Sequence, residues 1–157
     1  MSKLYIIDGN NLLHTIRKHE NLPGKWDFEK ARRKLSCRMR EFAGESEVNV
    51  ILIYDGTIGG LAPEYQTPDF QVIFTDALSS ADHLIEQLVA GHSKSEQITV
   101  VTSDRTEQNV VKAAGAFVIS CHNFIDQLDY CRKETIKGIN HSITKTPKVT
   151  LGDIFPE

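Results

Sequence analysis

The chain has 157 residues, of which 40% are hydrophobic and 25% are charged. This length and composition predict one compact globular domain and argue against a disordered chain. The longest stretch without a charged residue covers 13 residues, 113–125, which is too short to span a bilayer.

The N-terminus and the cysteines indicate the compartment in which the protein is expected. Asp8 interrupts the apolar run near the N-terminus, so we expect no signal peptide and a cytoplasmic location. Cys37, Cys121 and Cys131 form no Cys-x-x-Cys pair, which argues against a disulfide framework or a zinc site. We therefore expect reduced thiols in a reducing compartment.

The charges are distributed unevenly along the chain, although the net charge is only −3. Residues 17–40 hold nine of the 18 lysines and arginines, residues 41–104 hold eleven acids and one base, and residues 132–148 hold five bases and one acid. This pattern predicts an acidic centre flanked by basic arms, which would suit an anionic partner. Charge runs of this length are also typical of solvated helix faces.

The first half of the chain alternates short apolar runs with longer amphipathic ones. Residues 4–7 predict a strand, and we expect a short helix over residues 10–19. In residues 27–44 apolar side chains recur at helical spacing opposite basic ones, which predicts an amphipathic helix. Residues 48–54 predict a second buried strand. Residues 56–70 hold three glycines and two prolines and predict a long flexible loop.

The second half of the chain continues this alternation. Strands are predicted over residues 71–75, 98–102 and 117–119, and helices over residues 80–91, 105–114 and 122–136. Strands that alternate with helices predict right-handed βαβ units, and hence an α/β fold with a mainly parallel sheet of about five strands. We expect the domain to cover residues 1–138, and the polar residues 139–157 to form a tail that is either docked or disordered.

Acidic residues follow four of the five predicted strands: Asp8, Asp55, Asp76 and Asp104. The carboxyl ends of parallel strands lie at one edge of the sheet, where open α/β sheets bind ligands. A fifth aspartate, Asp82, falls in the first turn of the helix predicted over residues 80–91, with Glu86 on the same face.

Carboxylates that cluster in this way repel one another unless a cation neutralises them. Oxygen-rich acidic sites suit Mg²⁺ or Mn²⁺, bound as one or two ions. Two such ions can activate a water molecule and stabilise the leaving oxygen of a phosphodiester. The substrate would then be anionic, and the basic arms would hold its phosphate backbone.

Each of these acids also has a purely structural interpretation. Asp104 would serve as the N-cap of the next helix with Glu107 as its capping partner, and Asp55 precedes a glycine as in many turns. Asp82 would stabilise a helix N-terminus, and Asp76 lies outside any motif. Their shared placement at one predicted edge is what favours a binding site.

Five segments of the chain resemble the YacP-like NYN domain, which belongs to the PIN-like nuclease superfamily. They are residues 6–11 (IIDGNN), 53–56 (IYDG), 74–75 (FT), 80–86 (SADHLIE) and 101–105 (VTSDR). Their order and spacing agree with the family over about residues 4–130. Asn10 stands where the family often carries an aromatic residue, a departure that leaves the carboxylates intact.

The resemblance implies a three-layer Rossmann-like fold, a divalent metal, and endonucleolytic cleavage of RNA that is free or ribosome-associated. The catalytic and metal-binding residues that it implies are Asp8, Asp55, Asp82 and Asp104. Glu86 would be a further metal ligand. Asn11 and Ser103 would support the site, Ser103 by orienting metal ligands or water. The basic residues expected to bind RNA are Lys30, Arg33, Lys34, Arg40 and Arg105.

Other functional classes place aspartates at similar positions. A phosphatase of the haloacid-dehalogenase type needs an acid two positions after the first aspartate, where this chain has Asn10. A receiver domain needs a lysine at the end of the last strand, where this chain continues with Ser120 and Cys121. The absence of a Gly-x-Gly-x-x-Gly motif after the first strand argues against a dinucleotide-binding domain. A non-catalytic RNA-binding or adaptor module on the same fold is the main alternative to a nuclease.

Overall fold

The computed structural model describes residues 3–19, 27–56, 66–75, 80–92, 94 and 97–129. The elements within them are, in chain order, β1 (Leu4–Asp8), α1 (Gly9–His19), α2 (Phe28–Ser46), β2 (Asn49–Tyr54), β3 (Phe70–Phe74), α3 (Ala81–Gly91), β4 (Ile98–Val101), α4 (Arg105–Ala113) and β5 (Phe117–Ile119). A further helical segment covers residues 121–129. Across these ranges, no helix has the length and apolar character that a membrane span requires.

The strands form one parallel sheet with the order β3-β2-β1-β4-β5. β1 lies at the centre, with β2 on one side and β4 on the other. The chain first builds outward from β1 to β3, and then crosses back to build β4 and β5. A topological switch point therefore lies at the carboxyl ends of β1 and β4, where ligands bind in open α/β sheets.

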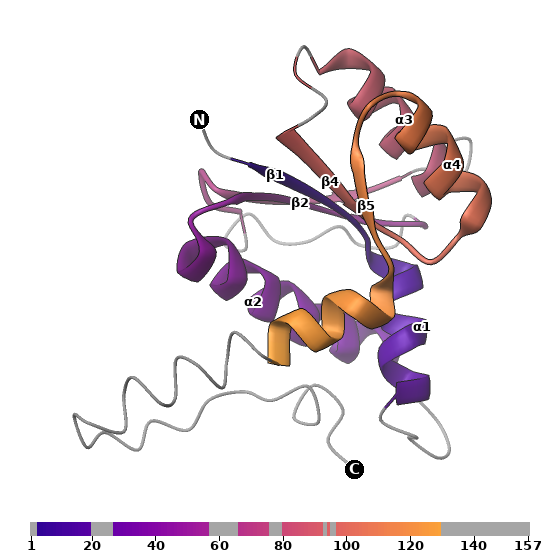
Figure 1. Cartoon of the computed structure of the whole chain (residues 1–157). Coiled ribbons are helices and arrows are strands. Elements are labelled where there is room, and N and C mark those ends of the chain that lie inside the picture. The colour runs from indigo at the N-terminus through magenta and orange to yellow at the C-terminus, as the bar shows by residue number, and fades with distance from the viewer. Residues whose placement is uncertain are drawn as a thin grey trace.

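Helices cover both faces of the sheet (Figure 1). α1, α2 and the segment 121–129 lie on one face, and α3 and α4 lie on the other. The change of face after β3 follows from right-handed crossovers, because the chain reverses its direction across the sheet there. Each face has its own apolar core, with Leu35 packed among residues such as Leu52 on one side and Ile85 among residues such as Ile6 on the other. This is the three-layer α/β fold that the resemblance implied.

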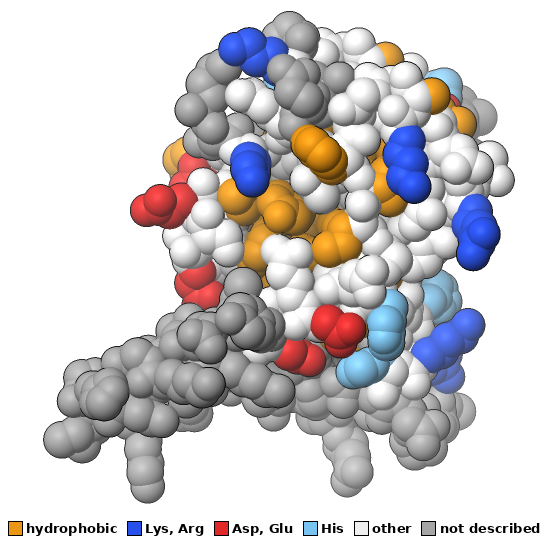
Figure 2. All heavy atoms as spheres, viewed as in Figure 1, with side chains coloured by type: hydrophobic (Ala, Val, Ile, Leu, Met, Phe, Trp, Pro, Cys, Tyr) orange, Lys and Arg blue, Asp and Glu red, His pale blue; other side chains and the backbone are white. Residues whose placement is uncertain are grey.

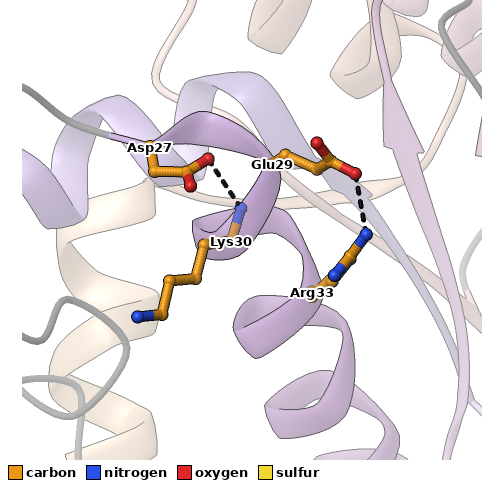
Figure 3. Close-up of polar contacts among 4 residues, drawn as sticks. All are labelled: Asp27, Glu29, Lys30 and Arg33. Atoms are coloured by element: carbon orange, nitrogen blue, oxygen red, sulfur yellow. Dashed lines mark hydrogen bonds and ion pairs between the residues drawn. The ribbon is translucent and has the colours of Figure 1, made fainter.

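The helices begin at residues with short polar side chains. Asp27 caps α2, and its carboxylate accepts a hydrogen bond from the backbone N–H of Lys30 at 3.1 Å (Figure 3). Ser80 caps α3 and Asp104 caps α4 in the same manner. Side-chain oxygens at these positions satisfy the N–H groups that a helix leaves unpaired in its first turn.

The predicted elements agree with the structure to within two residues at each described boundary. Asp8 is the last residue of β1 rather than the residue after it. Parts of the predicted organisation lie outside the described residues: the loop residues 57–65, Asp76, the end of the helix predicted to residue 136, and the tail 139–157.

Candidate metal centre

Three carboxylates meet at the carboxyl edge of the sheet. Asp8 ends β1, Asp82 lies in the first turn of α3, and Glu107 lies in the first turn of α4. One carboxylate oxygen from each residue lies within 4.8 Å of the other two. Asp8 and Glu107 are only 6% and 1% exposed, and Asp82 is half-buried. Three acids at this spacing form a candidate site for a divalent cation.

The topology of the sheet explains why these acids meet. α3 and α4 each follow a strand, so both begin at the carboxyl edge, and both lie on the same face of the sheet (Figure 1). Their first turns therefore reach the end of β1 at the switch point between β1 and β4. The cluster thus occupies the position where this class of sheet binds its ligands.

Burial and mutual repulsion make Asp8 a weak acid. Its pKa is raised to about 6, mainly because burial disfavours the charged form, and further because of the charges of Asp82, Asp55 and Asp104. The backbone N–H of Asn11 donates to Oδ1 of Asp8 at 3.2 Å and acts in the opposite direction.

The pKa of Glu107 is raised further than that of Asp8. Its pKa is raised to about 9 by burial, by contact with the Asp82 side chain and by the charge of Asp8. Without a cation, the folded protein therefore keeps a proton on Glu107 at neutral pH. A bound divalent cation would reverse this preference and favour the charged carboxylates.

One oxygen of Glu107 is held by a hydrogen bond, and the other has no partner. The hydroxyl of Thr102 donates to Oε2 of Glu107 at 3.1 Å and accepts from the backbone N–H of Asp104 at 3.2 Å. Oε1 of Glu107 is buried and finds no hydrogen-bond partner among the described residues. When Glu107 is charged, this buried oxygen has no donor, which is costly, and a cation would satisfy it. The donor set therefore fits a hard divalent cation.

Asp55 and Asp104 lie near the cluster, and each directs an oxygen at backbone N–H groups. Oδ1 of Asp55 accepts a hydrogen bond from the N–H of Ala81 at 2.7 Å. Oδ1 of Asp104 accepts from the N–H of Thr106 at 2.9 Å and from that of Glu107 at 3.3 Å. Each of these two aspartates therefore holds the first turn of a helix that brings another acid to the cluster.

Asn11, in the first turn of α1, joins the segments that follow β4 and β5. Its Oδ1 accepts hydrogen bonds from the backbone N–H of Ser103 at 2.8 Å and from the thiol of Cys121 at 3.1 Å. The hydroxyl oxygen of Ser103 in turn accepts from the backbone N–H of Cys121 at 3.1 Å. Burial raises the pKa of Cys121 to about 11, so the thiol is a neutral donor in this network. The residues expected to support the site are thus linked to each other beside it.

The cluster contains two of the aspartates predicted from the sequence, Asp8 and Asp82, and it does not contain Glu86. It adds Glu107, which the sequence analysis considered only as part of a helix cap. The helical spacing of the sequence does indicate that Glu107 is buried. Glu107 lies four residues before the fully buried Val111, so both residues share the face of α4 that packs on the sheet.

The predicted RNA-binding residues lie on two helices. Arg105 is exposed and is the first residue of α4, directly after the cap residue Asp104. The other four belong to α2: Lys30, Arg33, Lys34 and Arg40.

The environment of Arg33 is defined by an ion pair on the surface of α2. Its guanidinium lies 2.7 Å from a carboxylate oxygen of Glu29, and the two side chains are 61% and 71% exposed (Figure 3). Exposed pairs of this kind contribute little to stability. On the face seen in Figure 2, the lysine and arginine side chains stand apart over several elements and do not form one continuous patch.

Comparison with known proteins gives a consistent result. The chain is 27% identical over 154 residues to YacP of Bacillus subtilis (strain 168), and the aligned region covers 96% of this chain and 90% of that protein. A crystal structure of a point mutant of Rae1 (YacP) from Bacillus subtilis is similar with a TM-score of 0.72 and 24% identity, covering 96% of this chain and 89% of that one. A second crystal structure of Rae1 (YacP) has a TM-score of 0.69 and 26% identity, covering 90% and 81%.

The sequence also matches the YacP-like NYN domain over residues 5–153, which is nearly the whole chain. The parallel sheet, its flanking helices and the acidic cluster at its carboxyl edge agree with that match. The chain therefore belongs to the YacP-like NYN domain family, whose fold is that of PIN-like nucleases.

Proposed function

We propose that this chain is a metal-dependent endoribonuclease that hydrolyses phosphodiester bonds in RNA. The observation that carries the proposal is the cluster of Asp8, Asp82 and Glu107, whose ligand atoms lie within 4.8 Å of one another at the carboxyl edge of the sheet. Membership of a family with a nuclease-type fold supports the same conclusion.

The three carboxylates would hold one Mg²⁺ or Mn²⁺ ion, because both cations prefer carboxylate oxygens. Such an ion, when bound, would supply activation of a water molecule and stabilisation of charge on the scissile phosphate. Thr102 occupies Oε2 of Glu107 and leaves Oε1 free, so Glu107 offers a ligand atom with no competing donor. Asp8 is held by the N–H of Asn11, which fixes its carboxylate at the end of β1.

The basic residues would place the RNA against this site. Arg105 is exposed at the start of α4, two residues before Glu107, and would pair with a phosphate close to the scissile bond. The basic residues of α2 would hold the backbone farther from the cluster. These contacts are to phosphate, so they would bind RNA without selecting its sequence.

Cleavage of an end-labelled structured RNA by the pure chain tests this proposal, with Mn²⁺ or Mg²⁺ in one series and EDTA in the other. We expect internal cuts that require the cation and disappear in Asp8→Asn, which removes a charged ligand with little change in volume. Circular dichroism would check that the variant is folded. RNA binding without cleavage by the wild type, at every cation concentration, would instead support a non-catalytic RNA-binding module.

A further inference from the structure

Asp55 lies outside the acidic cluster and directs one carboxylate oxygen at the start of α3. Its Oδ1 accepts hydrogen bonds from the backbone N–H of Ala81 at 2.7 Å and from the hydroxyl of Thr75 at 3.3 Å. Ala81 is the first residue of α3, and the next residue is Asp82. Asp55 itself is exposed and lies outside the group of acids whose ligand atoms meet.

We propose that Asp55 is a positioning residue, which fixes the first turn of α3 through the N–H of Ala81 and so holds Asp82 against Asp8. This inference rests on the proposed function, because it assigns Asp55 a role at the same metal site.

The bond between Ala81 and Asp55 is not needed to start α3. Ser80 already caps the helix, since its hydroxyl oxygen accepts from the N–H of His83 and its carbonyl accepts from that of Leu84, both at 3.1 Å. Those contacts span at most four residues, whereas Asp55 and Ala81 are 26 residues apart. The cap by Ser80 stabilises the helix, and the hydrogen bond from Ala81 to Asp55 sets where the helix begins relative to the end of β2.

The position of the turn that carries Asp82 matters because three carboxylates must meet for one cation to bind them. The ligand atoms of Asp82, Asp8 and Glu107 lie within 4.8 Å of one another, and a shift of α3 would separate Asp82 from the other two. The turn that carries Asp82 is held down on the sheet by Ala81, which is fully buried in the same apolar core as Ile53. The carboxylate of Asp55 adds a polar anchor to the same residue, so the backbone next to Asp82 is fixed by packing and by a hydrogen bond.

Substitution by asparagine separates the two roles that Asp55 could have. The side-chain oxygen of asparagine accepts the same N–H and hydroxyl bonds, but the amide is neutral and is a weaker ligand for Mg²⁺ or Mn²⁺. A positioning role therefore tolerates Asp55→Asn and fails with Asp55→Ala. A ligand role fails with both variants.

The test is calorimetric titration of the full chain with Mn²⁺ alone, in the absence of RNA. We expect Asp55→Asn to bind Mn²⁺ within roughly threefold of the wild type. We expect Asp55→Ala to bind at least about tenfold more weakly, because loss of a residue that orients a ligand typically costs about 10–100-fold in metal affinity. Asp8→Asn serves as the reference for loss of a true ligand.

Asp27→Ala is the matched control for removal of an aspartate at a helix start. Asp27 accepts from the N–H of Lys30 at 3.1 Å in the first turn of α2, and neither residue belongs to the acidic cluster (Figure 3). This variant should bind Mn²⁺ as the wild type does. A lower Mn²⁺ affinity in Asp55→Ala alone would then reflect the position of α3 and not a general loss of helix capping.

Three outcomes would overturn the positioning role. Affinity of Asp55→Asn as low as that of Asp8→Asn would make Asp55 a ligand and leave the metal site in place. Wild-type affinity in Asp55→Ala would remove any role for Asp55. Failure of the wild type itself to bind Mn²⁺ would remove the metal site and the proposed function together. The decisive variant, Asp55→Asn, retains both hydrogen bonds, so its folding is not at issue.

Discussion

Thr102 determines how Glu107 is presented to the metal site. The residue is fully buried, and its hydroxyl donates to Glu107 and accepts from the N–H of Asp104. Thr102→Val keeps the shape of the side chain but leaves both groups without their partner. We predict about tenfold weaker Mn²⁺ binding in Thr102→Val, and recovery in Thr102→Ser, which retains the hydroxyl.

Thr99→Val provides the control for this prediction, because it makes the same change three residues earlier on β4, at a half-buried position outside the cluster. Its Mn²⁺ affinity should equal that of the wild type. The prediction would be wrong if Thr102→Val also bound Mn²⁺ as tightly as the wild type in the same titration.

Gly9 follows Asp8 at a point where the chain passes very close to β2. A Cβ atom there would lie 2.5 Å from Cε1 of Tyr54 and 2.8 Å from the carbonyl oxygen of Ile53. The Tyr54 ring is fully buried and its hydroxyl donates to the carbonyl of Arg32 at 3.2 Å, so the ring has no free space into which to move. We predict that Gly9→Ala lowers the free energy of unfolding by about 1–3 kcal/mol in urea denaturation.

Gly44→Ala is the matched substitution at a glycine with open space. Gly44 lies inside α2, and a Cβ there would meet nothing within 4 Å. Because alanine favours the helix, this variant should be more stable than the wild type by about 0.5–1 kcal/mol. Equal stability of Gly9→Ala and Gly44→Ala would contradict the steric argument at Gly9.

Among the helices, α2 carries four of the five basic side chains that the sequence assigns to RNA. We predict that the double charge reversal Arg33→Glu and Arg40→Glu weakens RNA binding and lowers its salt dependence, by about one unit of slope for each phosphate that is no longer bound. Filter binding over a salt series measures both quantities. Lys112→Glu, in the last turn of α4, is the control at the far end of a helix that starts at the cluster. An unchanged salt dependence of RNA binding in the double variant would show that this face of α2 contacts solvent and not RNA.

The elements themselves could be predicted because their periodicity is a local property of the sequence. Buried parallel strands give continuous apolar runs, and amphipathic helices give the spacing seen in α2 and α3. The order of the strands is different, because it depends on which strands pair in three dimensions. The neighbours of β1 are β2 and β4, and this pairing is what brings the start of α4 to the end of β1.

The candidate site was only partly predictable for the same reason. Asp8 and Asp82 stand out as acids at predicted element ends, and they do meet. From its sequence position, Glu107 fits a capping box equally well. The structure shows that its carboxylate instead accepts from the hydroxyl of Thr102 and belongs to the cluster. The contact between Asp55 and Ala81 joins residues 26 positions apart, so no local pattern indicates it.

For the molecule as a whole, the buried acids link stability to pH. The pKa values of Asp8 and Glu107 are raised to about 6 and about 9, whereas unfolded chains have carboxyl pKa values of about 4. The folded state therefore binds more protons than the unfolded state between these limits, and the free energy of unfolding falls as the pH rises through this window. We predict that the melting temperature in EDTA falls between about pH 5 and about pH 9.

Divalent cations should counteract this loss, because they replace the protons on the cluster. The stabilisation by saturating Mg²⁺ should therefore grow with pH, as measured by thermal melting in parallel EDTA and Mg²⁺ series. Glu107→Gln keeps the size of the side chain without its charge and should flatten the EDTA curve. A melting temperature in EDTA that rises over this pH range would contradict the linkage.

The metal site is tested most sharply by RNA cleavage in two glutamate-to-glutamine variants. Glu86 follows Asp82 by one helical turn and is favoured by the sequence, whereas Glu107 belongs to the cluster in the structure. In saturating Mn²⁺, Glu107→Gln should cleave at least about a hundredfold more slowly than the wild type, and Glu86→Gln should cleave at the wild-type rate. Wild-type cleavage by Glu107→Gln, or a loss of cleavage confined to Glu86→Gln, would contradict a metal site formed by Asp8, Asp82 and Glu107.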